Sequence, residues 1–151
     1  MKTATATALA FVSAISGAAI EPRQTPTPEF DVGGFAASCQ PHSVLCFFSL
    51  RVATTTTPFA TSCGVTVPGP NSLPAVGLTG CEDPRFSWAF EPRDGGAHVV
   101  TVNWEWTPGF NQTGSHLVRP EDVVLESHGS VATERYVGPS SFVIKPLLSI
   151  P

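Results

Sequence analysis

Residues 44–52, VLCFFSLRV, decide the fold of this chain because apolar side chains recur at every second position. One alternating set is apolar and is expected to line a core: Val44, Cys46, Phe48, Leu50 and Val52. The residues between them, Leu45, Phe47, Ser49 and Arg51, are then expected to face outwards. Side chains of a β-strand point alternately to opposite faces of the sheet, so this spacing predicts a strand with one buried face.

The same period recurs along the chain. Phe86, Trp88 and Phe90 share one face, and in residues 98–106 the shared face carries Val100, Val102, Trp104 and Trp106. Asp94-Gly95-Gly96 is a strong hairpin turn between these two segments. Further strands are expected at 30–37, 61–67, 122–127, 134–137 and 141–148. The chain has 15 prolines and 13 glycines to punctuate such strands, and no long window keeps a helical apolar stripe. We therefore expect an all-β fold, a flattened antiparallel β-barrel or β-sandwich with two disulfides.

The N-terminal residues have the organisation of a secretory signal peptide. Lys2 supplies a positive start, residues 8–15 are apolar, and the small residues of 16–19 offer a cleavage site. This apolar run is much shorter than the roughly 20 residues that cross a bilayer, which argues against a membrane anchor. We expect a signal peptide at 1–19, a disordered leader at 20–29 in which Arg23 could mark a second cut, and a single domain at 30–151. The protein is thus expected outside the cell.

The charge of the chain argues against two classes of partner. The 151 residues contain 8 Lys and Arg against 12 Asp and Glu, a formal net charge of −4. Phosphate recognition requires clustered basic side chains, and the few present here are scattered. We expect neither nucleic acid nor a membrane surface as a partner.

The four cysteines are Cys39, Cys46, Cys63 and Cys81, and all lie after the predicted signal. An even number in an oxidising compartment indicates a disulfide framework. Three pairings exist, and the loop entropies differ too little to choose among them. Cys39 and Cys46 can be bridged only if a turn intervenes, and residues 40–43, with Pro41, supply one. This turn favours the sequential pairing.

A glycosylation sequon and several aromatic residues are the candidate surface features. Asn111-Gln112-Thr113 follows a Pro-Gly pair and is expected to lie in a turn-like loop, with Asn111 as the acceptor. Trp88, Trp104 and Trp106 lie on apolar sides of alternating strands, which favours core packing. Trp104 and Trp106 are also candidates for contact with a ligand or partner, and Phe110 beside the sequon is the aromatic most expected to be exposed.

Catalytic and metal-binding motifs are weak throughout. The sequence has no Gly-x-Ser-x-Gly elbow, no His-Glu-x-x-His and no phosphate-binding glycine loop. Glu126 and Glu134 flank a predicted hairpin around Gly129 and could in principle form the carboxylate pair of a glycosidase, but solvated strand-edge charges are the favoured interpretation. The acidic pairs 82–83 and 121–122 are interpreted as turn acids rather than calcium ligands. We expect no enzyme activity, no cofactor and no metal.

Several motifs together resemble a known family. They are residues 38–43 followed by Cys46 and an aromatic-rich strand, then Cys63, the loop 69–74, the segment 79–85, the sequon at Asn111, residues 120–122, and 136–139. With its motifs in this order, the chain resembles the secreted fungal proteins grouped with the major Alternaria allergen. Within that group it is most similar to the hypersensitive-response-inducing elicitors. The resemblance covers roughly residues 30–150.

This resemblance implies a fold, a location and an activity. It implies an elicitor-like β-barrel domain of flattened shape, with disulfides Cys39–Cys46 and Cys63–Cys81, released into the plant apoplast. It also implies elicitor or effector activity through contact with a host extracellular protein, without catalytic residues. The allergen dimerises through an additional cysteine that this chain lacks, so we expect a monomer and no covalent dimer. The alternative function is a small-ligand or carbohydrate-binding secreted module that uses its indoles.

Overall fold

The computed structural model describes residues 27–147. The predicted signal peptide, Arg23 and most of the predicted leader lie outside the described residues. The described chain forms eleven strands and two short 3₁₀ helices, η1 (Asp94–Gly96) and η2 (Pro120–Asp122). The all-β prediction is therefore confirmed.

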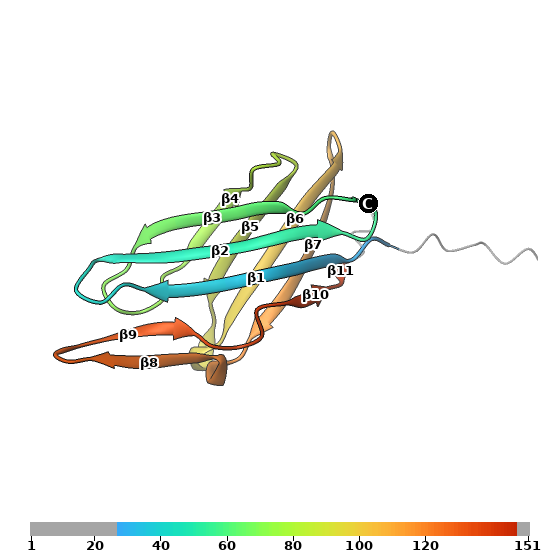
Figure 1. Ribbon diagram of the computed structural model, residues 1–151. Coiled ribbons are helices and arrows are strands. Elements are labelled where there is room, and N and C mark those ends of the chain that lie inside the picture. The colour runs from blue at the N-terminus through green and yellow to red at the C-terminus, as the bar shows by residue number, and fades with distance from the viewer. Residues whose placement is uncertain (1–26, 148–151) are drawn as a thin grey trace, which may run out of the picture.

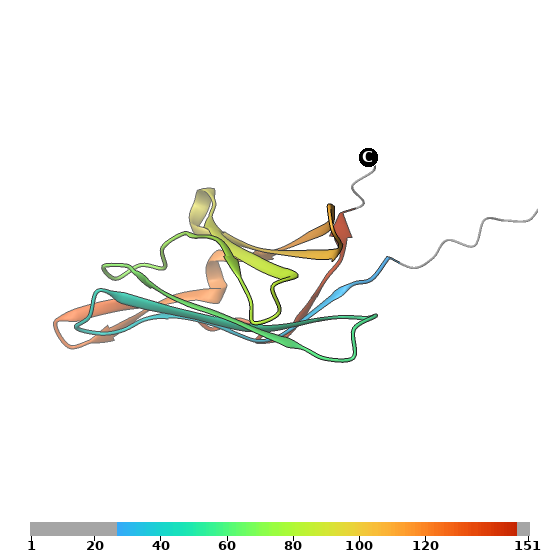
Figure 2. The same cartoon turned by 90° about the horizontal axis from the view of Figure 1, so that it is seen from above.

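The strands form two antiparallel sheets that face each other as two layers (Figures 1 and 2). The first sheet has the order β3 (Thr61–Pro68), β2 (Leu45–Thr54), β1 (Phe30–Cys39), β9 (Val131–Tyr136), β8 (Val123–His128), and β10 (Phe142–Ile144) also pairs with β1. The second has the order β11 (Pro146–Leu147), β7 (Phe110–Val118), β6 (His98–Thr107), β5 (Phe86–Pro92), β4 (Val76–Gly80). Over residues 27–147 the two sheets do not close into one barrel, so of the two predicted architectures the sandwich is the one observed.

The end of the described chain joins the two layers. After β10 pairs with β1 in the first sheet, the chain passes Lys145 and pairs as β11 with β7 of the second sheet. Gly114 of β7 lies directly under this crossing, because a Cβ built on it would be 2.5 Å from Ile144 Cγ2 and 3.1 Å from the carbonyl oxygen of Lys145. Only a glycine lets the two strands approach so closely.

The core lies between the layers and follows the period-two pattern. Cys46, Phe48, Leu50 and Val52 of β2 are buried as predicted, and they meet the inner face of β5, on which Trp88 and Phe90 are fully buried. The Phe48 ring lies 5.1 Å from that of Phe90, centroid to centroid. Val44 is the exception to the predicted inward set, since β2 begins one residue later and the Val44 side chain is exposed.

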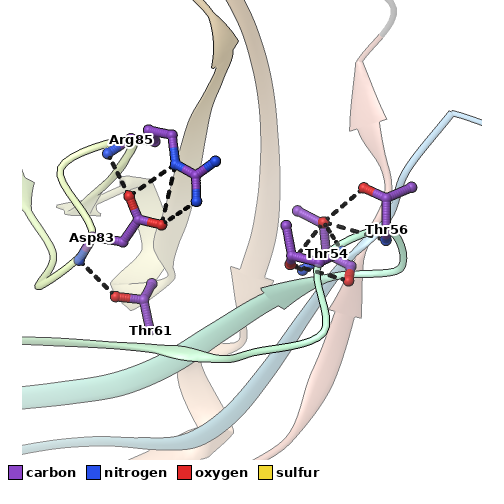
Figure 3. Close-up of polar contacts among 6 residues, drawn as sticks. Thr54, Thr56, Thr61, Asp83 and Arg85 are labelled. Carbon is purple, nitrogen blue, oxygen red and sulfur yellow. Dashed lines mark hydrogen bonds and ion pairs between the residues drawn. The ribbon is translucent and has the colours of Figure 1, made fainter.

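Both disulfides form with the sequential pairing. Cys39 and Cys46 are directly paired residues of the β1–β2 hairpin, with Cα atoms 3.9 Å apart. Cys63 of β3 is bridged to Cys81, which follows β4, so the second disulfide joins the two sheets. A hydrogen bond reinforces this connection, because the Asp83 backbone N–H donates to Thr61 Oγ1 over 2.9 Å (Figure 3).

Two strands were not predicted, and both contain weak strand formers. β4 has the sequence VGLTG, with glycines at two of five positions. β7 has the sequence FNQTGSHLV, in which polar residues occupy most positions. Its pairing partner β6 supplies the apolar residues of that region, so β7 is recruited by backbone pairing along the sheet rather than by its own pattern.

Candidate functional site

An exposed aromatic pair marks the tip of the β6–β7 hairpin, which extends past β3 in Figure 1. Trp106 is 51% exposed and Phe110 is 60% exposed, and their ring centroids lie 5.8 Å apart at 56°. The register shifts between Glu105 and Thr107, so Trp106 leaves the regular pairing there. The turn closes at Gly109, whose φ is 84° and whose backbone N–H donates to Glu105 Oε1.

Trp104 lies one step further into the sandwich and is not part of this surface. It is 7% exposed, and its ring stacks on Phe86 with centroids 5.9 Å apart. The expected core packing therefore holds for Trp88 and Trp104. Of the three candidate contact residues, Trp104 is removed by burial, whereas Trp106 and Phe110 are accessible. The alternating pattern predicted that Trp106 shares the inner face with Trp104. This prediction was wrong because a bulge between Glu105 and Thr107, which the pattern does not reveal, shifts the alternation.

Asn111 lies on a strand rather than in the loop expected from the sequence. It is exposed and pairs with Glu105 across the β6–β7 ladder. Thr113 of the sequon donates from its hydroxyl to Asn103 Oδ1 on the same face of the sheet. The turn residues are Pro108 and Gly109, and the chain returns to extended backbone at once. Asn111 is nonetheless available for modification, since its side chain is on the outer face.

Glu126 and Glu134 do not form a carboxylate pair. They lie on the β8–β9 hairpin, and Glu126 pairs with Thr133, so Glu126 and Glu134 point to opposite faces. Glu126 forms an ion pair with Arg135, which lowers the pKa of the Glu126 carboxyl. Glu134 instead accepts a hydrogen bond of 2.8 Å from the Leu73 backbone N–H through Oε2. The arrangement of a glycosidase is absent at this hairpin.

Three of the four acidic turn residues, Asp83, Glu121 and Asp122, form ion pairs with arginines. Asp83 Oδ2 lies 2.6 Å from Arg85 Nη2, and this hydrogen bond lowers the pKa of the Asp83 carboxyl (Figure 3). Asp122 is paired in the same way with Arg119. Within residues 27–147 no three His, Cys, Asp or Glu side chains gather as a metal site would require. No helix in the same range is long and apolar enough to cross a membrane.

A hollow of about 480 Å³ opens at the end of the sandwich where η1 and η2 lie. It is lined by the loop Ser72–Ala75, by His98 at the start of β6, by Glu134 of β9, and by Pro92, Gly96, Pro120 and Val123. His98 is 7% exposed and stacks on Phe90 with ring centroids 4.7 Å apart. Burial lowers the pKa of its imidazole, and the charge of Glu134 opposes this effect. Sequence patterns did not bring these two residues together, because His98 and Glu134 lie on different sheets.

Comparison with known proteins gives no family assignment. No protein-family model matches the chain, and no curated protein matches it significantly. The likeness to Alternaria allergen-related proteins therefore stays a prediction that rests on the motifs quoted from the sequence.

Proposed function

We propose that the protein is a secreted, non-catalytic fungal elicitor or effector that induces plant defence or a hypersensitive response by binding a host extracellular protein. The observation that carries the proposal is the exposed pair of Trp106 and Phe110 at the hairpin tip. Aromatic side chains supply large contact area with few rotatable bonds, and they are enriched where proteins bind one another.

The rest of the molecule suits work outside the cell. All four cysteines of the chain are in intrachain disulfides, one within a sheet and one between sheets. Such bridges persist in oxidising compartments and are rare in the cytosol. The Cys63–Cys81 bridge ties the two layers of the sandwich together. Since no cysteine is left to link two copies, the protein acts as a monomer or associates without covalent bonds.

Infiltration of the purified mature protein into leaves tests the proposal. The wild-type protein is expected to cause local cell death or defence-gene expression, and Trp106→Ala with Phe110→Ala is expected to reduce the response strongly. Phe59→Ala is the matched control, because Phe59 is an exposed aromatic residue in the β2–β3 connection and is not part of the β6–β7 hairpin. Loss of the response with Phe59→Ala but not with the hairpin variant would refute the role of the tip.

Capture from plant apoplastic fluid identifies the partner. A host protein is expected to be retained by the immobilised wild-type protein and by Phe59→Ala, and to be lost from the double hairpin variant. A glycan array with the same proteins tests the alternative carbohydrate-binding function. Glycan binding that depends on Trp106, together with no retained host protein, would replace the protein-binding proposal by that alternative.

A further inference from the structure

Another hollow opens on the outer face of the first sheet, between the β1–β2 hairpin and the β8–β9 hairpin. This β1–β9 hollow has a volume of about 370 Å³. It is lined by residues 38–41 and Phe47 of the first hairpin, and by Glu126, His128, Thr133 and Arg135 of the second. The turns of these two hairpins lie at the opposite end of the molecule from the β6–β7 tip (Figures 1 and 2).

Strand pairing places a small residue between two large ones and so creates the β1–β9 hollow. Ser38 of β1 pairs with Phe47 of β2 on one side and with Arg135 of β9 on the other. Directly paired residues point to the same face of a sheet, and neighbouring strands lie about 4.8 Å apart. Phe47 and Arg135 therefore flank a gap roughly 10 Å wide, which the short Ser38 side chain cannot fill.

The walls of this hollow are held in place by other parts of the fold. The Cys39–Cys46 disulfide cross-links the hairpin that carries Phe47. On the facing wall, Arg135 Nη2 donates to Glu126 Oε1. Groups that are already fixed lose less conformational freedom when a ligand binds, so the hollow is suited to binding without rearrangement.

The groups on both walls are accessible, and their charges are balanced. Phe47 is 44% exposed, and the side chains of Arg135 and Glu126 are 49% and 35% exposed. Glu126 Oε2 lies 3.8 Å from His128 Nε2, which is longer than a hydrogen bond, so this oxygen can accept from a ligand. Because the carboxylate and the guanidinium group cancel in charge, the walls favour an uncharged ligand that both donates and accepts hydrogen bonds.

We propose that the β1–β9 hollow binds one uncharged sugar ring of a glycan. A pyranose has an apolar C–H face, which packs on the Phe47 ring, and an edge of hydroxyl groups. These hydroxyls donate to the Glu126 carboxylate and accept from the Arg135 guanidinium group. The volume of about 370 Å³ is within the usual range for small-molecule sites. Trp106 and Phe110 do not line this hollow, so sugar binding here is independent of the proposed partner contact.

Matched neutral and acidic sugars test the site on the wild-type protein. The neutral probes are methyl β-glucopyranoside and methyl β-galactopyranoside, and the acidic probes are the corresponding uronic acid glycosides. In titrations followed by ¹⁵N NMR at pH 7.5, at least one neutral probe is expected to shift the amides of Ser38, Phe47 and Thr133. The matching acid should bind no more tightly, because Glu126 already neutralises Arg135.

Phe47→Ala is the diagnostic variant, and it is expected to weaken binding of the neutral probe roughly tenfold through loss of one aromatic contact. Phe47→Tyr should retain binding. Phe59→Ala is the matched control, since Phe59 is exposed but does not line the hollow. The double variant Trp106→Ala with Phe110→Ala should also bind as the wild type does.

Three results would overturn the proposal. They are no amide shift with either neutral probe, tighter binding of an acid than of its neutral counterpart, and unchanged affinity in Phe47→Ala. Loss of sugar binding in the double hairpin variant alone would assign it to the β6–β7 tip instead. A leaf response that fails while sugar binding persists would count against the elicitor function and not against this site.

Discussion

At Gly114 a single added carbon atom would force apart the strands that join the two layers. Gly114→Ala is expected to lower the free energy of unfolding by roughly 1–3 kcal/mol, the usual cost of overpacking. Its Cβ would meet Ile144 and the backbone of residues 145–146, which cannot move away without breaking the β10–β11 crossing. Urea unfolding followed by tryptophan fluorescence measures the loss.

Gly77→Ala is the control for that measurement. Gly77 also lies in a strand of the second sheet, but a Cβ there meets nothing within 4 Å. This variant is expected to be neutral or slightly stabilising, because alanine reduces the entropy of the unfolded chain. Equal destabilisation by the two substitutions would mean that the close approach at Gly114 is not the cause.

His98 gives the fold a dependence on pH. Burial lowers the pKa of His98 in the folded protein, and Glu134 is the one charged group that acts against this effect. In the unfolded chain the ordinary value of about 6.5 applies. The unfolded state then takes up more protons as the pH falls below that value, so the free energy of unfolding decreases until the lower folded pKa is passed.

Unfolding free energies at pH 7.5, 6.5 and 5.5 are expected to decline, and His98→Gln should decline less steeply. Part of the pH dependence of the unfolding free energy should remain in His98→Gln, because burial also lowers the pKa of His116, which stacks on Phe142. His128→Gln, at an exposed position, is the comparison variant. An identical slope in the wild type and His98→Gln would show that this imidazole does not titrate as proposed.

At the scale of elements, the two disulfides differ in what they connect. Cys39–Cys46 joins two strands that already pair with each other, whereas Cys63–Cys81 joins β3 of one sheet to the end of β4 in the other. In the loop-entropy model the loops of 7 and 18 residues contribute about 2.5 and about 3.2 kcal/mol. We expect replacement of Cys63 and Cys81 by alanine to lower the melting temperature more than replacement of Cys39 and Cys46.

Differential scanning calorimetry of the two double variants and of the reduced wild type measures this difference. The reduced protein should be the least stable of the three. The interpretation fails if removal of the Cys39–Cys46 bridge is the more damaging change, or if dithiothreitol leaves the melting temperature unchanged.

Elements with a strong alternating pattern could be predicted from the sequence, and those without one could not. The pattern of residues 44–52 gave β2 and its buried face, and Asp94-Gly95-Gly96 gave the connection between β5 and β6. β7 was missed because its polar residues face solvent on one side and its partners supply the burial. The exposed position of Trp106 depends on a bulge in the pairing of β6 with β7. The alternation of residues along one strand carries no information on its register with a neighbouring strand.

At the scale of the whole molecule, the all-β class and both disulfides were predicted, but the candidate sites were only partly found. Trp106 and Phe110 were named from the sequence, whereas the hollow combines His98, Glu134 and the loop Ser72–Ala75. These residues are far apart in the chain and meet only when the two sheets pack. No local pattern contains that information, since it depends on which strand ends come together.

The pairing of β10 with β1 also constrains when this protein can fold. The first strand of the described chain, β1, pairs along one of its edges with β10, which lies more than a hundred residues later. β11 follows β10 and pairs with β7 in the second sheet. Such distant contacts slow folding. As the chain emerges N-terminus first during synthesis, the sandwich stays incomplete until the residues around Ile144 have appeared. Until then β1 has an open edge, and dependence on chaperones and oxidising enzymes should be greatest in this interval.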